Sequence, residues 1–412
     1  MTGPVTACQS CGSAKLETIL SLGSLPACNS FVPIGAPDCP ELFYPHDLLK
    51  CESCQLVQLG YLPSQTETFP VSYPYTSSTT KALRDNFADL AAEVASLHPM
   101  APEDLVVDIG GNDGNLLSNF VGKHQVLNVT PEDIGQLGLD RGIPHLQRYW
   151  DKATASLVVS GRGKAKLITA TNVFAHVPDP NEFVQSVLSC LTDDGVFVTE
   201  SHYLGAILKG NQWDAIYGEH ARYLSLESIR NILERHGLTI AYSREIDSHG
   251  GSIRVYACRP DYARQVVERV KGISKGRWRT EDHIYPHDFE NFTRRVSQSK
   301  RDLWRLLSSI KEMGGRIFGI GAPSRASTLI NYVGIDQNVL DCICEIDGSH
   351  KIGKYMPGTR IPVVSESALY EQKPEYALML NHHLCDTMVY KIRQSGYAGK
   401  FIRPLPDVEV IQ

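Results

Sequence analysis

Residues 105–120 read LVVDIGGNDGNLLSNF, and this stretch decides the fold. A mostly apolar run is followed by a turn that contains Gly110, Gly111 and Gly114, and then by a segment with helical periodicity. This order predicts a buried strand, a tight turn and a helix, as in α/β domains. The turn is not a P-loop, because no Gly-Lys-Ser/Thr follows it, and it does not match Gly-x-Gly-x-x-Gly.

Strand and helix patterns alternate on both sides of this turn. Helical periodicity begins near residue 81, and strand candidates lie at 105–110, 125–129, 167–171, 195–200 and 250–258. Such alternation predicts a parallel α/β sheet with helices on both faces. We therefore expect a central α/β domain over residues 81–260.

A second, smaller α/β domain is expected at the C-terminus. Residues 261–315 predict a linker and a spacer helix, with helical periodicity over 288–313. Strand patterns then return at 316–322, 339–347, 375–381 and 400–404, separated by helical segments. This renewed alternation predicts a Rossmann-like α/β domain over residues 316–412.

The first 80 residues predict a small module held by a metal ion. They contain several prolines and little helical periodicity, so we expect a loop-rich module that buries little core alone. Two Cys-x-x-Cys pairs stand in it, at Cys8, Cys11, Cys51 and Cys54. Two such pairs complete a tetrahedral site of four thiolates, which suits zinc and leaves no open position for catalysis. Reduced pairs without metal are the alternative.

Composition limits the classes of function. The chain has 412 residues, a formal net charge of −6 and a hydrophobic content of 42%. An acidic chain without a basic stripe argues against nucleic-acid binding, and no apolar run reaches the ~20 residues of a membrane span. The first residues lack the basic and apolar regions of a secretory signal. We therefore expect a cytoplasmic protein with a small-molecule partner, and neither a nucleic acid nor a membrane.

The glycine-rich turn resembles the first motif of class I S-adenosylmethionine methyltransferases, Asp/Glu-x-Gly-x-x-x-Gly. In that motif the glycines let the backbone approach the methionine part of the cofactor, and Asp108 is placed to receive its ammonium group. An acidic residue is expected at the end of the next strand, where it holds ribose hydroxyls. That strand ends at Thr130 instead, so Glu132 or Asp133 would have to substitute.

Several stretches, taken in chain order, resemble the sugar C-methyltransferases of antibiotic biosynthesis, which methylate nucleotide-linked keto-deoxysugars. They are the paired cysteines, YPYTSS (73–78), DIGGNDGNLL (108–117), NVFAHVPD (172–179), YGEH (217–220), GGSIRVY (250–256) and GIGAPSRASTLINY (319–332). The resemblance covers nearly the whole chain. It implies a zinc-binding module, a class I methyltransferase domain and a C-terminal α/β domain that helps to hold the substrate nucleotide.

The resemblance also implies a chemistry, the methylation of a carbon next to a ketone. A base removes a proton from that carbon, and the resulting enolate attacks the sulfonium methyl group. His220 is the expected general base, because a neutral imidazole suits this role near pH 7. Glu219 would orient His220 or contact a sugar, and Tyr217 and His176 would hydrogen-bond the enolate oxygen or sugar hydroxyls.

Further residues are assigned to the two ligands. The expected cofactor residues are Asp108, Gly110, Asn112, Asp113, Gly114, Thr130 and Asn172. The expected substrate residues are Tyr73, Tyr75, Asn172, Tyr223, Ser324 and Arg325. Tyr75, or Tyr73 in its place, would reach in from the N-terminal module. The last two residues would add a hydroxyl and a charge to an anion site at a helix start.

Departures from the family pattern point to a divergent substrate. They occur at Thr130, Gly218, Arg325, Ala326 and the pair His382–His383. Two other functions are therefore considered, namely a methyltransferase acting on a non-sugar molecule and a non-catalytic binding protein on this fold. There are also plainer interpretations of single residues. His176 would cap a helix, Tyr217 and Tyr223 would be boundary residues, and Glu219 with His220 would be a solvated surface pair.

Overall fold

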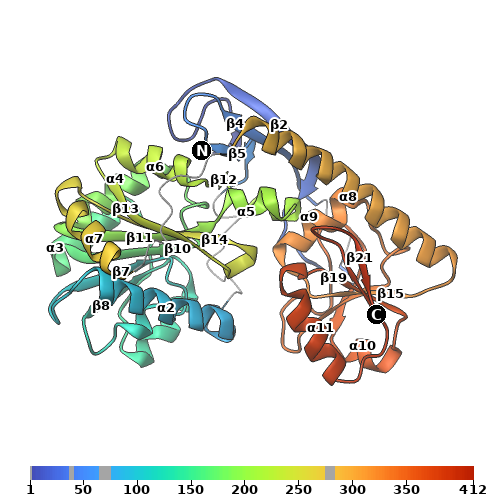
Figure 1. The fold of residues 1–412 in the computed structure, drawn as a ribbon. Helices are drawn as coiled ribbons and strands as arrows, with labels where there is room; N and C mark the ends of the chain where they lie inside the picture. The colour runs from blue at the N-terminus through green and yellow to red at the C-terminus, as the bar shows by residue number, and fades with distance from the viewer. Residues whose placement is uncertain (1, 37–40, 65–75, 274–283) are drawn as a thin grey trace.

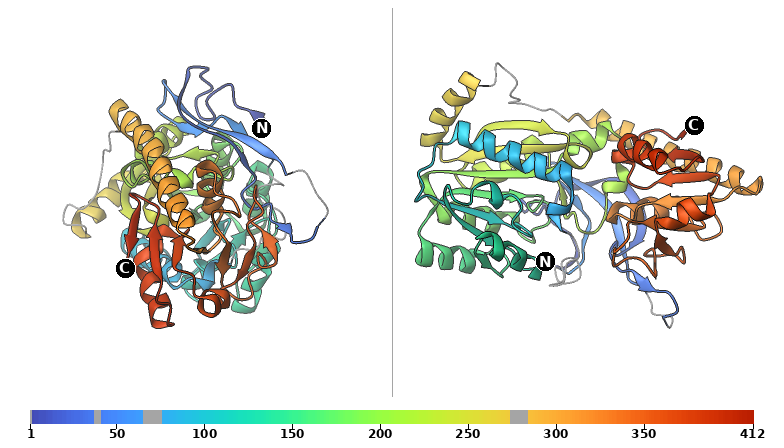
Figure 2. Two further views of the ribbon diagram at one scale, coloured as in Figure 1. Left: turned by 90° about the vertical axis from the view of Figure 1, so that its right-hand side faces the viewer. Right: turned by 90° about the horizontal axis from the view of Figure 1, so that it is seen from below.

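The computed structural model describes residues 2–36, 41–64, 76–273 and 284–412. Two α/β bodies lie side by side, and the N-terminal module bridges them at one end (Figure 1). The two further views show the long helix α8 (Pro286–Glu312) running along the C-terminal body (Figure 2). Within the described residues, no helix combines the length and the apolar character needed to cross a bilayer.

The central body is built on a seven-stranded sheet of order β13-β14-β11-β10-β7-β8-β9. Its strands are β7 (Leu105–Ile109), β8 (Gln125–Val129), β9 (His145–Leu146), β10 (Ala165–Thr171), β11 (Leu191–His202), β13 (Thr239–Ile246) and β14 (Ser252–Cys258). β7 to β11 are parallel, as predicted, whereas β14 is antiparallel to both of its neighbours. The loops that follow the parallel strands therefore meet at one edge of the sheet.

Helices cover this sheet. They are α2 (Lys81–Leu97), α3 (Lys152–Arg162), α4 (Pro180–Cys190), α6 (Leu226–Arg235) and α7 (Pro260–Ile273), while α5 (Leu204–Lys209) packs on α8. Short 3₁₀ helices η1 (Ser77–Thr79), η2 (Leu117–Asn119), η3 (Asp133–Arg141), η4 (Trp213–Ala215) and η5 (Ser248–Gly250) connect them. α2 begins at the predicted residue. α7 packs on β13, so the segment predicted as a linker begins with a helix of the central body.

The N-terminal module contains a four-stranded antiparallel sheet of order β12-β5-β4-β2. Its strands are β2 (Leu16–Pro26), β4 (Phe43–Cys51), β5 (Val57–Leu59) and β12 (Arg222–Tyr223). The expectation of a loop-rich module is wrong here, because β2 and β4 form a long hairpin. β12 comes from the central part of the chain and pairs with β5, so the module's sheet is completed by a strand distant in sequence.

The C-terminal body has a six-stranded sheet of order β18-β16-β15-β19-β20-β21. Its strands are β15 (Ile317–Ile320), β16 (Cys342–Glu345), β18 (Val363–Ser365), β19 (Tyr376–Met379), β20 (Lys400–Arg403) and β21 (Glu409–Ile411). Its helices are α9 (Ser324–Val333), α10 (Ser367–Gln372), η6 (His382–Leu384) and α11 (Cys385–Gln394). The four predicted strands are confirmed, and β18 and β21 extend the sheet at its two edges.

One hydrophobic core joins the N-terminal module to the C-terminal body. Leu20, Leu22 and Leu48 of the module belong to the same buried cluster as Phe292 and Val296 of α8. A two-stranded pair, β3 (Val32–Pro33) with β17 (Lys354–Tyr355), adds to this connection, whereas β1 (Gly3–Pro4) pairs with β6 (Tyr61–Leu62) inside the module. The small module therefore obtains its core from a neighbouring body as well as from its own residues.

Candidate active site

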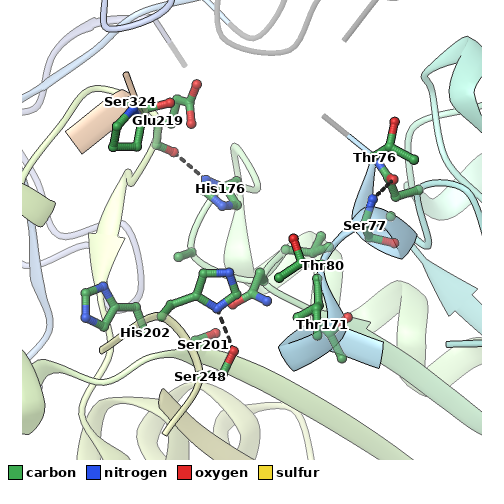
Figure 3. A pocket seen from close by; sticks show the side chains of 18 of the residues that line it. Thr76, Ser77, Thr80, Thr171, His176, Ser201, His202, Glu219, Ser248 and Ser324 are labelled. Atoms are coloured by element: carbon green, nitrogen blue, oxygen red, sulfur yellow. Dashed lines mark hydrogen bonds between the residues drawn. The ribbon is translucent and has the colours of Figure 1, made fainter. Parts of the chain in front are cut away.

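A cavity of about 1410 Å³ opens between the central body, the N-terminal module and the C-terminal body. It is lined by the ends of β7, β10 and β11, by the start of α9 and by residues of the segment 215–220, called the catalytic segment because the predicted base His220 lies in it. Figure 3 shows Glu219 and Ser324 together at one side, Thr76 and Ser77 at the other, and His176 between them. The cavity thus gathers residues from all three parts of the chain.

Asp108 lies at the C-terminal end of β7 and faces this cavity. Its side chain is buried, Oδ1 accepts a hydrogen bond from Thr169 Oγ1 at 2.7 Å, and Oδ2 has no partner among the described residues. Burial raises the pKa of Asp108 to about 7. A buried carboxylate oxygen without a partner is suited to a cationic group such as an ammonium.

The turn after β7 exposes its main chain to the cavity. Gly110 has φ +67°, and Asn112 has φ 50°, both in the left-handed region. A Cβ at Gly110 would lie 2.5 Å from Val173 Cγ2, and one at Gly111 would lie 2.6 Å from Asp108 Oδ2. Only glycine fits at these two positions. The bare turn beside an unpartnered carboxylate oxygen fits the methionine part of S-adenosylmethionine.

Asp113 and Gly114 support the turn from behind and are not among the residues that line the cavity. Asp113 Oδ1 accepts a hydrogen bond from Ser77 Oγ at 2.5 Å, and its Oδ2 lies 3.6 Å from Arg141. Gly114 has φ +77°, and a Cβ there would lie 2.9 Å from Ile143. We therefore expect these two residues to shape the cofactor turn without direct contact.

The end of β8 offers an acidic residue in place of the buried Thr130. The Thr130 hydroxyl donates to the carboxylate of Glu132, which lines the cavity. Asp133 instead accepts a hydrogen bond from the exposed Gln147 at 2.6 Å. Glu132 is thus the better-placed substitute for the missing ribose ligand. Asn172, with φ 57°, also lines this end of the cavity.

Replacement of Asp108 by asparagine is expected to stabilise the ligand-free protein and to weaken cofactor binding. The pKa of Asp108 is about 7 in the folded protein and has its ordinary value of 3.8 in the unfolded chain. The unfolded chain therefore ionises at lower pH, and this carboxyl group destabilises the folded state as the pH rises from 3.8 to about 7. The destabilisation is complete above about pH 7. The thermal midpoint should therefore rise, and rise more at pH 8 than at pH 5. The affinity for S-adenosylhomocysteine should fall about 10- to 100-fold, as expected for a lost charge-assisted hydrogen bond.

Thermal melts at the two pH values and calorimetric titration with S-adenosylhomocysteine measure these effects. A raised midpoint together with unchanged affinity would show that Asp108 does not hold the ammonium group.

His220 lies in the catalytic segment, between η4 and β12. Its Nε2 is 3.1 Å from the Tyr217 hydroxyl, and its ring centroid is 4.9 Å from that of His176 and 6.3 Å from that of His202. Burial, reinforced by the neighbouring histidines, lowers the pKa of His220 well below 6.5. The ring is therefore neutral at pH 7 and able to accept a proton.

Glu219 connects all three parts of the chain. Its carboxylate accepts a hydrogen bond from Asn29 of the N-terminal module, and Asn29 Oδ1 accepts one from Ser324 Oγ of α9 at 3.0 Å. Its main-chain oxygen lies 2.6 Å from His176 Nδ1 (Figure 3). Burial raises the pKa of Glu219 to about 7. This carboxyl group is bonded to Asn29, and the role of Glu219 in orienting His220 stays a prediction.

The structure does not support His176 as a helix cap, nor Glu219 with His220 as a solvated surface pair. Asp179, and not His176, caps α4, since it accepts from two main-chain N–H groups of the first turn. Glu219 is only 7% exposed, and His220 is half-buried in the cavity wall, so the two are not a solvated surface pair.

Only one of the four tyrosines predicted at the site is seen among the described residues of the cavity wall. Tyr217 lines the cavity, whereas Tyr223 is buried in the core on β12 and is absent from the residues that line the cavity. Tyr73 and Tyr75 lie outside the described residues. Substrate contacts by Tyr73, Tyr75 and Tyr223 therefore stay predictions.

Arg325 is held in a buried ion pair. Its Nε and Nη2 donate to the two carboxylate oxygens of Asp214 at 2.7 and 2.8 Å, and His382 Nε2 lies 2.8 Å from Asp214. Burial opposes ionisation of Asp214, but Arg325 and His382 hold its pKa well below the usual range. Thr328 Oγ1 also donates to Ile216 O at 3.1 Å. α9 thus fixes the chain just before the catalytic segment.

The sequence did not single out four further residues of the cavity, which are Asn29, His202, His249 and Lys351. His202 is the last residue of β11, and Lys351 lies in the loop after β16, so position at or after the end of a strand was the available signal. Lys351 Nζ donates to Ala322 O at 2.7 Å, just before α9, and burial lowers its pKa. No sequence pattern pointed to Asn29.

The predicted cysteine cluster is present. The four sulfur atoms of Cys8, Cys11, Cys51 and Cys54 lie within 4.8 Å of one another. The Sγ atoms of Cys8 and Cys54 are 3.5 Å apart, and those of Cys11 and Cys51 are 3.6 Å apart. Tetrahedral zinc with bonds of about 2.3 Å separates its sulfur ligands by about 3.8 Å, so these residues fit a closed zinc site.

Three family models match consecutive parts of the chain. Residues 8–69 match a zinc-binding domain, residues 79–243 a methyltransferase domain, and residues 247–406 the C-methyltransferase C-terminal domain. The chain is also 29% identical to the C-methyltransferase NovU of Streptomyces niveus over 411 residues. This alignment covers 99% of the present chain and 97% of NovU.

Solved methyltransferases also resemble part of the chain, somewhat less than half of it. A methyltransferase dependent on S-adenosylmethionine from Clostridium acetobutylicum is 14% identical and has a TM-score of 0.35, covering 43% of this chain and 92% of its own. Magnesium protoporphyrin IX methyltransferase from Synechocystis, solved with bound S-adenosylhomocysteine, is 16% identical with a TM-score of 0.33, covering 43% and 82%.

Proposed function

We propose that this S-adenosylmethionine-dependent methyltransferase is a C-methyltransferase of the kind with an N-terminal zinc-binding domain, and that it methylates a nucleotide-linked keto-deoxysugar at the carbon next to the ketone. A role in natural-product biosynthesis belongs to the same proposal. The observation that carries it is one cavity shared by Asp108, His220 and Ser324. Its volume of about 1410 Å³ exceeds the ~300–1,000 Å³ of ordinary ligand pockets, which suits a cofactor beside a long substrate.

His220 takes the proton from the carbon next to the ketone. Burial keeps its imidazole neutral, and Nε2 receives the proton while the electron pair of the C–H bond passes into the enolate. S-adenosylmethionine, when bound, would supply the methyl group: the enolate carbon would form its bond to the methyl carbon as the sulfur–methyl bond breaks, with S-adenosylhomocysteine as the leaving group. The Tyr217 hydroxyl lies 3.1 Å from Nε2, close enough to donate to the ketone oxygen of a substrate whose neighbouring carbon stands at Nε2.

Donors beside His220 stabilise the charge that develops on the ketone oxygen. Burial raises the pKa of Tyr217 well above 10, so its hydroxyl keeps its proton. Glu219, with a pKa of about 7, is partly protonated at neutral pH and is a second donor in the cavity wall. Preorganised donors of this kind lower the barrier because they are in place before the charge appears.

The start of α9 is the expected site of the nucleotide phosphates. Free main-chain N–H groups at a helix start favour anions, and Ser324 and Lys351 stand beside this one. Arg325 is neutralised by Asp214, so we expect it to hold the chain before the catalytic segment and to contribute little charge to the phosphates.

Ligand binding and methyl transfer test this proposal. Nucleoside diphosphates should raise the thermal midpoint of the protein, and S-adenosylmethionine with a nucleotide-linked 4-keto-6-deoxysugar should give a product carrying one more carbon-bound methyl group by mass spectrometry and NMR. Binding of neutral ketones without nucleoside diphosphates would favour a non-sugar substrate. A protein that does not bind S-adenosylhomocysteine would favour the non-catalytic alternative.

A further inference from the structure

Gln9 stands inside the first cysteine knuckle, between the metal ligands Cys8 and Cys11, and its side chain contacts the strand next to His220. Gln9 is only 4% exposed, and its Nε2 donates to Ala221 O at 3.2 Å. Its Oε1 accepts two hydrogen bonds from Arg222, from Nε at 3.1 Å and from Nη2 at 2.6 Å. A residue of the metal knuckle is thus bonded to the two residues that follow the proposed base.

The main chain of the knuckle is fixed as well. Gln9 N donates to the buried Gln58 Oε1 at 2.9 Å, and Asn181 Nδ2 donates to the main-chain oxygens of Gln9 and Ser10 at 3.1 and 3.0 Å. Gln58 lies on β5, the partner strand of β12, and Asn181 lies on α4. The Gln9 side chain therefore extends from a main chain that is held in place. It has little freedom to follow Ala221 or Arg222 if these residues move.

Arg222 connects the strand β12 to the loop that bears His176. It is fully buried, and its Nη1 donates to Phe174 O at 2.9 Å, two residues before His176. Ala221 O also accepts from Leu59 N at 3.0 Å, which joins the same strand to β5. The knuckle, β12 and the loop that bears His176 therefore form one hydrogen-bonded unit.

We propose that Gln9 is a positioning residue, through which the metal-held knuckle sets the placement of His220 and His176. The inference rests on the proposed catalytic role of these histidines. A displacement of about 1 Å at a reacting group can lower a rate about 100-fold, so such a link has a measurable effect on turnover. Zinc would then define the geometry of the active site without touching the substrate.

Gln9→Leu tests the link, because leucine is of similar size and removes all three side-chain hydrogen bonds. We expect one zinc per chain and unchanged affinity for S-adenosylhomocysteine. We also expect faster hydrogen–deuterium exchange over residues 217–223 and shifted NMR signals of His220 and His176. On the proposed substrate, kcat should fall about 10- to 100-fold. Ser10→Ala is the matched control, since Ser10 Oγ has no partner within the described chain and shares the same knuckle.

A second variant covers the case in which Gln9→Leu fails to fold. Gln9→Glu keeps an acceptor for Arg222, loses the donor to Ala221 O and places a carboxylate beside the Arg222 guanidinium, so we expect smaller changes of the same kind. Unaltered exchange and unaltered histidine signals in both variants would overturn the proposal, whatever the substrate. Altered signals without any turnover in the wild-type protein would leave the link standing and count against the proposed substrate instead.

Discussion

Replacement of His220 by asparagine lowers kcat about 10²- to 10⁴-fold, the range that a general base contributes. Asparagine keeps a polar side chain of similar reach but cannot take up the proton that imidazole accepts at Nε2. The affinity for S-adenosylhomocysteine should stay unchanged, because His220 lies in the catalytic segment between η4 and β12, whereas Asp108 lies near the end of β7. Steady-state methylation and calorimetric titration measure the two quantities.

A substrate-level measurement isolates the proton transfer. In D₂O, with S-adenosylhomocysteine in place of the methyl donor, the wild-type enzyme should exchange the proton next to the ketone, and the variant should not. Near-normal exchange in His220→Asn would remove His220 from the role of base. The pH profile gives an independent check. Because burial lowers its pKa, the loss of activity from protonation of His220 should occur only below pH 6.5.

Replacement of Cys51 by serine removes the zinc and destabilises the N-terminal module. Cys51 is fully buried, and structural zinc sites contribute about 10–16 kcal/mol of binding free energy that is available only to the folded state. We expect a loss of more than about 4 kcal/mol in the free energy of unfolding, which is exceptional for a single substitution. Metal analysis and denaturant unfolding test this expectation.

Cys190→Ser is the matched control for this change. Cys190 is also fully buried, but it lies on α4, outside the cysteine cluster. This variant should keep one zinc per chain and lose only the smaller free energy of burying a hydroxyl group. Equal zinc content in both variants would contradict the assignment of Cys51 as a ligand. Treatment of the wild-type protein with a chelator should reproduce the effect of Cys51→Ser.

The fold could be predicted where hydrophobic periodicity is strong. α2 begins at Lys81 as expected, and the parallel strands β7, β8, β10 and β11 lie at the predicted positions. Periodicity did not reveal β13, which lies at the edge of the sheet and mixes polar residues into its sequence. Nor did it reveal that β12, only two residues long, belongs to the sheet of the N-terminal module, because such pairing depends on residues distant in the chain.

The candidate site was predictable where a motif names the residue. The cysteine spacing indicated the metal cluster, and the glycine-rich turn indicated Asp108. The motifs did not indicate which side chain pairs with a given charged residue in the folded protein. The sequence favoured Arg325 as a phosphate ligand, whereas its guanidinium is paired with Asp214 from another part of the chain. Asn29 was missed for the same reason, since only the folded chain brings it to Glu219.

Because β12 comes from the central part of the chain and completes the sheet of the N-terminal module, it affects the order of folding. During synthesis β5 is made long before Arg222 and Tyr223, and until they arrive its Val57–Leu59 edge is open and apolar. An unpaired edge of this kind is prone to pair with another chain. A nascent or recombinant fragment that stops before residue 222 should therefore be prone to self-association even when it holds zinc. The chain's first-made module is then among the last to reach its final form.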